Sequence, residues 1–399
     1  MRRSAINLHH NNLMNRILFW LLALATLAGN AQPYAVGHTT ITFQDPARGN
    51  RNVPTEMYYP ANSAGENVAL AVGLEVKFPV LVFGHGFVMT WDAYENIWQN
   101  LVPQGFIVAF PKTEGSFSPS HMEFGKDIAF LVEAITALDT VSSSLFFGHV
   151  DSMNCVMGHS MGGGAVFLAA SLSPKIKTMA TLAAAETSTS AIQAASSISI
   201  PSLVIAGAND CVTPPANHQL PMYQNLQSAC KTYISIVGGS HCQMAESNFY
   251  CNFGEATCTP APTISRSKQH EILFRYLIPW LKYQLKGDCV AANAFNSGIA
   301  SDTEITFQKN CALCPPSSLD DRSQMDYSPT PNPFTESLFF NKLPAKSELV
   351  ILDSMGKKVF EKDSTETVRL DTHLWPSGVY FYQIMDENGG QSHGKLIKM

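Results

Sequence analysis

The stretch MNCVMGHSMGGG, residues 153–164, decides the fold of this 399-residue chain. A short apolar run leads into Gly-His-Ser-Met-Gly, and a small-residue run with helical character, AVFLAA at 165–170, follows without a linker. In a strand–turn–helix elbow of this kind, flanking glycines remove side chains that would collide with the strand and the helix. The stretch could also be a glycine-rich turn capped by a serine. Its flanking strand and helix favour Ser160 as a nucleophile faced by the first N–H groups of the helix.

Apolar runs and helical patterns alternate on both sides of this elbow. Residues 38–60 alternate apolar and polar side chains and predict paired opening strands. The remaining alternation implies βαβ crossovers, and therefore an α/β fold with a doubly wound, mostly parallel sheet. Ligands of such sheets bind at the carboxyl ends of the strands. The further predicted strands are 79–84, 105–110, 176–184, 201–207 and 233–238, and the predicted helices are 91–101, 127–138, 215–229 and 269–285.

Two residues at later strand ends could activate the serine. Asp210 follows the apolar run 201–207, and His241 follows the run 233–238. A serine hydroxyl needs a base to remove its proton, and the imidazole needs a carboxylate that holds its tautomer. Taken singly, Asp210 could be a turn residue and His241 a loop residue. Their order after Ser160 along the chain is the one expected for a Ser-Asp-His triad on this architecture.

A developing oxyanion needs two N–H donors, and the chain offers two candidates. The first is the amide of Met161 at the start of the helix, and the second is that of Phe87, which follows Gly86 after the strand 79–84. Residues 85–87 could also form an ordinary turn. His159 is expected in the pocket wall rather than as the base. No stretch suggests a metal site, because Cys311 and Cys314 lack the second ligand pair of a zinc site.

Composition excludes some classes of function. Hydrophobic residues make up 45% and charged residues 15% of the chain, which is typical of a folded globular protein. The formal net charge is −6, and no basic stripe with interleaved aromatics indicates nucleic-acid binding. We expect a monomer.

The beginning of the chain resembles an export signal. Arginines precede an apolar run at 17–28, which ends in Gly29-Asn30-Ala31. This pattern predicts a signal peptide, residues 1–31. The alternative is an uncleaved membrane anchor, but about a dozen apolar residues are too few to span roughly 30 Å of hydrocarbon.

Export makes disulfides possible, and the chain has nine cysteines. An odd number leaves at least one unpaired, and Cys155 in the elbow strand is the expected free thiol. In a parallel sheet Cys211 and Cys242 follow neighbouring strands at the same edge, so we expect them to pair, and Cys211 with Cys230 is the poorer alternative. The other expected closures are local: Cys251 with Cys258, and Cys289 with Cys311 or Cys314.

The chain changes character after Cys289. Residues 291–330 lack sustained periodicity and become rich in Ser, Asp and Pro, which predicts a linker between a catalytic domain, residues 32–290, and a second domain. Residues 331–399 contain short strands at 348–353, 358–361, 367–370 and 379–385, which predict a small all-β sandwich.

The first domain resembles a known enzyme family. The run 150–164, Ala208-Asn209-Asp210, Leu220-Pro221-Met222-Tyr223 and Gly238-Gly239-Ser240-His241 are similar to polyester hydrolases of the cutinase and poly(ethylene terephthalate) hydrolase type, and to the related dienelactone-hydrolase-like and chlorophyllase-like esterases. The resemblance covers residues 38–290. It implies an α/β-hydrolase fold, no cofactor, Ser160, Asp210 and His241 as the triad, and the amides of Phe87 and Met161 as the oxyanion hole.

A substrate-binding set is also expected. This set comprises Phe87, His159, Met161 and Glu186. Many polyesterases carry a tryptophan where this chain reads AAAET at 183–187, so an aromatic platform is not expected there. The segment 246–263, with two cysteines, is also longer than the corresponding loop.

The last domain has its own resemblance. Pro331-Asn332-Pro333-Phe334, LVILDSMGK at 349–357, LWPSGVY at 374–380 and GKLIK at 394–398 resemble the type A sorting domain of the type IX secretion system of Bacteroidetes. This resemblance implies that the secretion machinery binds residues 331–399 and that the protein is secreted or reaches the cell surface. The alternative is a fibronectin-like accessory domain that stays on the mature protein.

The combined prediction is a secreted serine ester hydrolase acting on polyester, cutin-like or other carboxylic esters. A lipase or a small-ester carboxylesterase would use the same triad. A peptidase is less favoured, because the chain shows no lid and no anchor for a peptide terminus. The non-enzymatic alternative is a surface adhesin that has kept a hydrolase fold.

Overall fold

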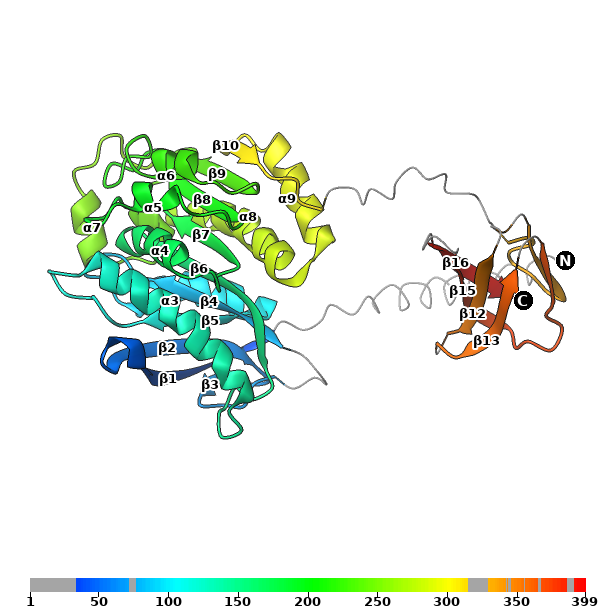
Figure 1. Cartoon of the computed structure of the whole chain (residues 1–399). Helices are drawn as coiled ribbons and strands as arrows, with labels where there is room; N and C mark the ends of the chain where they lie inside the picture. The colour runs from blue at the N-terminus through cyan, green and yellow to red at the C-terminus, as the bar shows by residue number, and fades with distance from the viewer. Residues whose placement is uncertain are drawn as a thin grey trace, which may run out of the picture. The chain divides into compact units, whose positions relative to one another are not determined.

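The computed structural model describes residues 34–71, 77–314, 329–341, 343, 346–354, 356–364, 367–385 and 391–399. The chain divides into two compact units, Met1–Cys314 and Pro315–Met399 (Figure 1). The predicted signal peptide, residues 1–31, lies outside the described residues. Within the described ranges, none of the helices combines the length and the apolar character that a membrane crossing needs.

The first unit is built on one large sheet. Among the described residues it has ten strands in the order β10-β9-β8-β7-β6-β4-β5-β2-β1-β3. The strands from β5 to β9 in this order run parallel, whereas β1, β2 and β10 pair antiparallel with their neighbours β2, β5 and β9. The strands are β1 (Ala35–Asp45), β2 (Arg51–Ala61), β3 (Gly65–Glu66), β4 (Phe78–Gly84), β5 (Ile107–Pro111), β6 (Val150–His159), β7 (Thr178–Leu182), β8 (Ser202–Gly207), β9 (Lys231–Ile236) and β10 (Ile305–Asn310).

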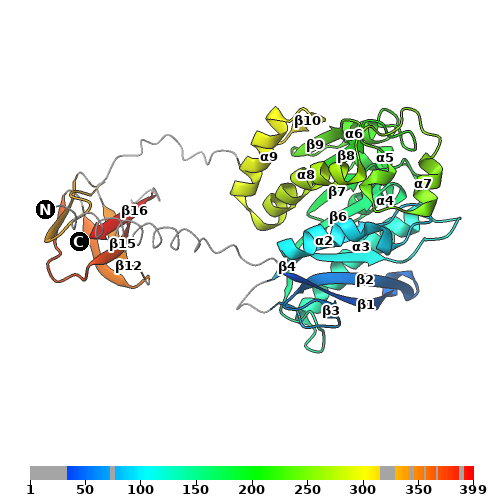
Figure 2. The same cartoon turned by 180° about the vertical axis from the view of Figure 1, so that it is seen from behind.

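Helices cover both faces of this sheet. Figure 1 shows α3 and α4 in front of it, and Figure 2 shows α2, α8 and α9 on the opposite side. The predicted α/β fold with a mostly parallel sheet is therefore confirmed. The helices are α2 (Glu95–Leu101), α3 (His121–Ala137), α4 (Met161–Leu172), α5 (Ala191–Ala195), α6 (Gln219–Asn225), α7 (Phe249–Glu255), α8 (Arg266–Lys286) and α9 (Cys289–Ser301).

The central strands are apolar throughout because each face has its own core. In β4, Val80 and Val82 belong to the core beneath α3 and α4, while Leu81 and Phe83 belong to the core beneath α2 and α8. All four side chains are fully buried. Successive side chains of a strand point to opposite faces, so a sheet covered on both sides needs continuous apolar runs.

The predicted linker at 291–330 is wrong in its first part. Helix α9 packs on α8 through Phe295, whose ring lies 5.8 Å from the rings of both Tyr276 and Trp280. Strand β10 then pairs antiparallel with β9, so the sheet has one strand more at this edge than the predicted run at 233–238. The alanine- and serine-rich α9 has few large apolar residues, and its burial depends on α8, which lies before it in the chain.

The second unit is all-β, as predicted. Its described residues form a two-stranded antiparallel sheet, β11-β14, and a four-stranded antiparallel sheet, β13-β12-β15-β16, around a core that includes Phe340, Ile351 and Tyr382. The strands are β11 (Ser337–Phe340), β12 (Ser347–Asp353), β13 (Lys358–Ser364), β14 (Val368–Asp371), β15 (Gly378–Met385) and β16 (Gln391–Lys398).

Candidate active site

Ser160 occupies the sharp turn between β6 and α4. Its φ of 55° and ψ of −121° lie in a region that residues with a side chain rarely adopt. The turn brings the helix against two strands, and only glycine fits there. A Cβ on Gly162 would overlap the carbonyl group of Gly84, and one on Gly158 would lie 2.5 Å from the carbonyl carbon of Gly162. Backbone contacts of this kind force the hydroxyl group to the strand-end edge of the sheet.

The structure brings Asp210 and His241 to this hydroxyl group. Asp210 follows β8 and His241 follows β9, and parallel strands end at the same edge. The carboxylate Oδ2 lies 2.8 Å from His241 Nδ1 and must accept a hydrogen bond from it, which leaves Nε2 as the acceptor for Ser160 Oγ at 2.9 Å. Ser160, Asp210 and His241 are all buried, with exposed fractions of 9%, 4% and 2%.

Thr213 supports the carboxylate, and the sequence did not single it out. Its N–H donates to Asp210 Oδ1 at 2.7 Å and its hydroxyl group donates to Oδ2 at 2.8 Å. Gln219 in turn donates to the Thr213 hydroxyl group at 3.0 Å and to the carbonyl oxygen of Ala184 at 2.6 Å. Asp210 is therefore held in one orientation as a hydrogen-bonded buried carboxylate.

The loop that carries His241 is fixed from two sides. The carboxylate of Glu255 in α7 accepts from the N–H groups of His241 at 2.8 Å and Cys242 at 3.2 Å. The side chain of Gln269 in α8 makes two hydrogen bonds to the backbone of Ser240, at 2.9 and 2.8 Å. The imidazole therefore needs no rearrangement of its loop to face Ser160.

His159 lies behind the site rather than in its wall. Its Nε2 donates to the carbonyl oxygen of His241 at 3.1 Å, and its Nδ1 accepts from the Tyr94 hydroxyl group at 3.0 Å. That hydroxyl group also accepts from the N–H of Gly86 at 2.7 Å. Burial, followed by the neighbouring His241, keeps the pKa of His159 well below its usual value, so this ring is neutral. His159 and Tyr94 thus join the turn before Phe87 to the His241 loop.

The two expected oxyanion donors come from the start of α4 and from the turn after β4. Met161 is the first residue of α4, so its N–H has no acceptor one turn earlier in the helix. Phe87 follows the β4 strand and lines the same pocket as Ser160 and His241. Roles for these two amides stay a prediction.

The pocket at Ser160 has a volume of about 300 Å³. Of the four expected substrate-binding residues, only Phe87 lines it. The side chains of His159 and Met161 are buried, and the carboxylate of Glu186 accepts from the N–H of Ile192 at the start of α5. The lining residues are Phe87, Val88, Met89, Phe117, Ser160, Val212, His241, Cys242, Tyr250, Cys251, Phe253 and Gly254.

Three of the aromatic lining residues were missed. Phe117 lies in the loop between β5 and α3, and Tyr250 and Phe253 lie in α7. The one signal in the sequence was the unusual length of the segment 246–263 with its two cysteines. Within the described part of the chain, no group of three His, Cys, Asp or Glu side chains could hold a metal ion.

Two predicted disulfides are wrong. All nine cysteines are described, and the structure pairs Cys211 with Cys258 and Cys242 with Cys251, instead of Cys211 with Cys242 and Cys251 with Cys258. The reason is α7, whose segment folds over the ends of β8 and β9 and places one cysteine beside each of their loops. The loops after Asp210 and His241 are therefore both bound covalently to the α7 segment.

The other two disulfides hold the last part of the first unit. Cys289 pairs with Cys314, one of its two expected partners, whereas Cys311 pairs with Cys230. Because β10 runs antiparallel to β9, Asn310 lies opposite Lys231, and the next residue reaches the start of β9. Cys155 is the free and buried thiol, as predicted.

Comparison with known proteins agrees with this arrangement. The model of the PET hydrolase-like family matches residues 23–289. The chain belongs to the PET hydrolase-like family. The model of the secretion system C-terminal sorting domain matches residues 330–399, so the second unit is a type IX sorting domain that marks the protein for export to the medium or the cell surface.

The similarity to curated relatives extends over part of this chain. The bis(hydroxyethyl) terephthalate hydrolase of Streptomyces coelicolor is 24% identical over 193 residues, which are 48% of this chain and 56% of that protein. Cutinase 1 of Thermobifida cellulosilytica is 30% identical over 149 residues, or 37% of this chain and 47% of the relative. A cutinase of Thermobifida fusca is also 30% identical over 149 residues, or 37% and 41%. The chain spans about half the length of the curated relatives it matches.

Proposed function

We propose that this chain is a secreted serine ester hydrolase that acts on polyester or cutin-like carboxylic esters. The observation that carries the proposal is the continuous series of hydrogen bonds from Ser160 through His241 to Asp210, at 2.9 and 2.8 Å. Its position in an exported member of the PET hydrolase-like family, whose relatives are named cutinase and bis(hydroxyethyl) terephthalate hydrolase, supports the substrate class.

The mechanism is acyl transfer to water. Ser160 Oγ attacks the ester carbonyl carbon while His241 Nε2 takes the hydroxyl proton, and Asp210 stabilises the resulting imidazolium. The amides of Phe87 and Met161 hold the tetrahedral oxyanion, and such donors contribute about 3 to 4 kcal/mol each to transition-state stabilisation. Collapse expels the alcohol, which receives the proton from His241. Water then attacks the acyl-enzyme with His241 again as base, and the acid leaves.

The experiment compares the purified protein with its Ser160→Ala variant on p-nitrophenyl butyrate and on an aliphatic polyester suspension. We expect turnover of both substrates and a loss of about 10⁴-fold or more in the variant. Turnover of the butyrate alone would favour a small-ester carboxylesterase or a lipase. Turnover of neither substrate by the wild-type protein would favour a surface adhesin.

A further inference from the structure

The pocket at Ser160 is bordered by aromatic side chains that folding leaves in water. Phe117 and Phe253 are 73% and 75% exposed, and Phe87 and Tyr250 are 46% and 50% exposed. All four line the pocket together with Ser160 and His241. Single exposed apolar residues are common on protein surfaces, but a contiguous group beside a candidate nucleophile indicates a binding surface.

We call these four residues the aromatic rim. The rings of Phe87, Phe117 and Tyr250 pack on one another from three separate segments of the chain, and Phe253 lines the same pocket one turn further along α7. The ring of Phe117 lies 6.2 Å from that of Phe87 and 6.2 Å from that of Tyr250, and both pairs are close to perpendicular. Figures 1 and 2 both show the loop between β5 and α3 at the same end of the sheet as α7. Edge-to-face pairs of this kind stabilise a fixed arrangement of rings.

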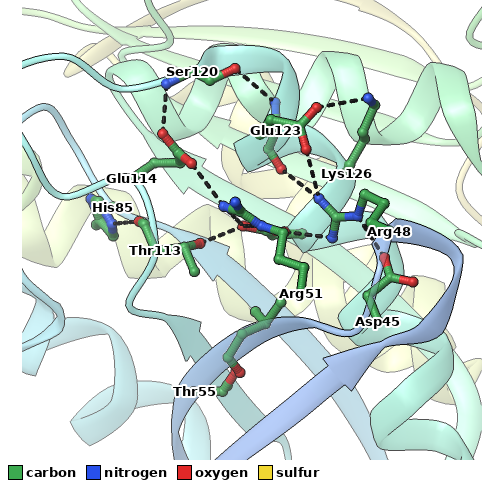
Figure 3. Close-up of polar contacts among 12 residues, drawn as sticks. Asp45, Arg48, Arg51, Thr55, His85, Thr113, Glu114, Ser120, Glu123 and Lys126 are labelled. Carbon is green, nitrogen blue, oxygen red and sulfur yellow. Dashed lines mark hydrogen bonds and ion pairs between the residues drawn. The ribbon is translucent and has the colours of Figure 1, made fainter.

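The loop of Phe117 is held by charged groups. Glu114 pairs with Arg51 Nη2 at 2.8 Å and accepts from the N–H of Ser120 at 2.6 Å, so both ends of the segment around Phe117 are fixed (Figure 3). Thr113, at the start of the loop, accepts from His85 Nε2 through its carbonyl group at 2.8 Å. The exposure of Phe117 therefore belongs to an anchored loop.

The α7 part of the rim is held even more firmly. The disulfides Cys211–Cys258 and Cys242–Cys251 bind its segment to the loops that follow Asp210 and His241. Such an arrangement presents Tyr250 and Phe253 at a constant position relative to the nucleophile. A surface whose side chains are ordered before binding loses less conformational entropy when the ligand binds.

The chemistry of the lining limits the ligand. Of the described residues that line the pocket, none carries a carboxylate, an ammonium or a guanidinium group. Val88 and Val212 add aliphatic surface, and the polar side chains among the lining residues are those of Ser160, His241 and Tyr250. The rim therefore suits an uncharged apolar unit, whereas a charged ligand would lose its hydration without finding a partner.

We propose that the aromatic rim binds the apolar repeat unit next to the scissile ester of a polymeric substrate, with Phe117, Tyr250 and Phe253 as specificity-determining residues. This inference rests on the proposed function, because it assumes that Ser160 attacks an ester. A short soluble ester occupies the site at Ser160 without reaching α7. A polyester chain continues past that site and contacts the rim.

The test uses the full chain with Phe253→Ala and, as a control, Phe147→Ala; Phe249 is unsuitable because its ring packs on those of Tyr250 and Phe253. Phe147 is 50% exposed and comes just before β6, at the opposite end of that strand from Ser160, and it does not line the pocket. Initial rates are measured on p-nitrophenyl acetate, a polycaprolactone suspension and a triolein emulsion, and adsorption to polycaprolactone film is measured in a Ser160→Ala background. We expect Phe253→Ala to lower polyester hydrolysis about 3- to 10-fold with little change on the acetate, and to weaken adsorption. Phe147→Ala should leave all three rates within about 2-fold.

Other results would overturn the inference. Equal losses in both variants would show a general effect of surface apolarity, and an equal loss of acetate and polyester hydrolysis in Phe253→Ala would show a structural effect on the His241 loop. A loss confined to triolein would assign the rim to lipid. In each of these cases the wild-type protein still hydrolyses esters and Ser160→Ala still abolishes that hydrolysis. If the proposed function is wrong, the wild-type protein hydrolyses no ester, or its hydrolysis survives Ser160→Ala.

Discussion

The carboxylate of Asp127 offers the sharpest test of what holds the loop of Phe117 in place. This side chain is fully buried in α3 and receives hydrogen bonds from Arg51 at 2.9 Å and from the Thr113 hydroxyl group at 2.6 Å. Arg48 Nη2 lies 2.5 Å from Oδ1, the oxygen that also accepts from Arg51 Nε. Asp127→Asn keeps the shape of the side chain but removes its charge. It also replaces one of the two acceptor oxygens with an NH₂ group, which can only donate. At least one guanidinium N–H then faces another donor.

The expected loss of folding free energy follows from the burial of Asp127. Breaking a buried ion pair by removing one partner costs about 3 to 5 kcal/mol of folding free energy. The side chains of Arg48 and Arg51 are 16% and 29% exposed, so water can solvate them in part once Asp127 is replaced. We therefore expect the lower end of that range, about 3 kcal/mol, and a fall in Tm of roughly 6 °C or more.

The assay is urea unfolding and calorimetry of the full chain. Glu123→Gln serves as the control, because Glu123 also pairs with Arg48, at 3.2 Å, but its side chain is 33% exposed. Exposed pairs contribute about 0 to 1 kcal/mol, so this variant should change stability little. If Asp127→Asn costs no more than Glu123→Gln, the reasoning that assigns the anchoring of this cluster to one buried carboxylate is refuted.

Three further predictions concern thiols and pH. Burial raises the pKa of the Cys155 thiol, so iodoacetamide should label no cysteine of the native protein. After unfolding without reductant it should label Cys155 alone, which peptide mass spectrometry can check. A second labelled site would contradict the four disulfides. Replacing Cys211 and Cys258 with serine removes a bridge that closes a 47-residue loop. The entropy of loop closure predicts a loss of about 4 kcal/mol in the free energy of unfolding, measured in urea. A loss of less than about 1 kcal/mol would contradict this prediction. Burial lowers the pKa of His85 and His159, so the unfolded chain takes up protons first as the pH falls, and stability that is complete above about pH 6.5 should decline below it. His85→Asn should reduce this slope by up to about 1.4 kcal/mol per pH unit, measured as Tm between pH 7.5 and 5; an unchanged slope would show that His85 does not contribute.

Much of the fold could be predicted because its signals are local. The elbow at Ser160 needs glycine at specific positions, and strands covered on both faces need continuous apolar runs such as 79–84. The positions of Asp210 and His241 could also be inferred, since parallel strands end at one edge of the sheet. The structure places Asp210 within hydrogen-bonding distance of His241, and His241 within hydrogen-bonding distance of Ser160.

Elements whose stability comes from distant partners were harder to predict. Strand β10 has one strongly buried residue, Ile305, and its pairing with β9 spans about 70 positions of sequence. Helix α9 is buried by α8 rather than by a strong apolar stripe of its own. Supporting contacts such as Thr213 on Asp210 and Glu255 on the His241 loop involve common polar residue types, whose role depends on where the chain brings them.

The sequence by itself therefore determined the α/β class, the all-β last unit, the free thiol at Cys155 and the order of the candidate triad, because each depends on short-range pattern or strand order. Only the tertiary structure decided that Cys211 pairs with Cys258 and Cys242 with Cys251, and which residues form the pocket wall. A disulfide or a binding surface requires that atoms from separate segments meet within a few ångströms. Here the packing of α7 over the ends of β8 and β9 produces both, and neighbouring positions in the sequence do not encode that contact.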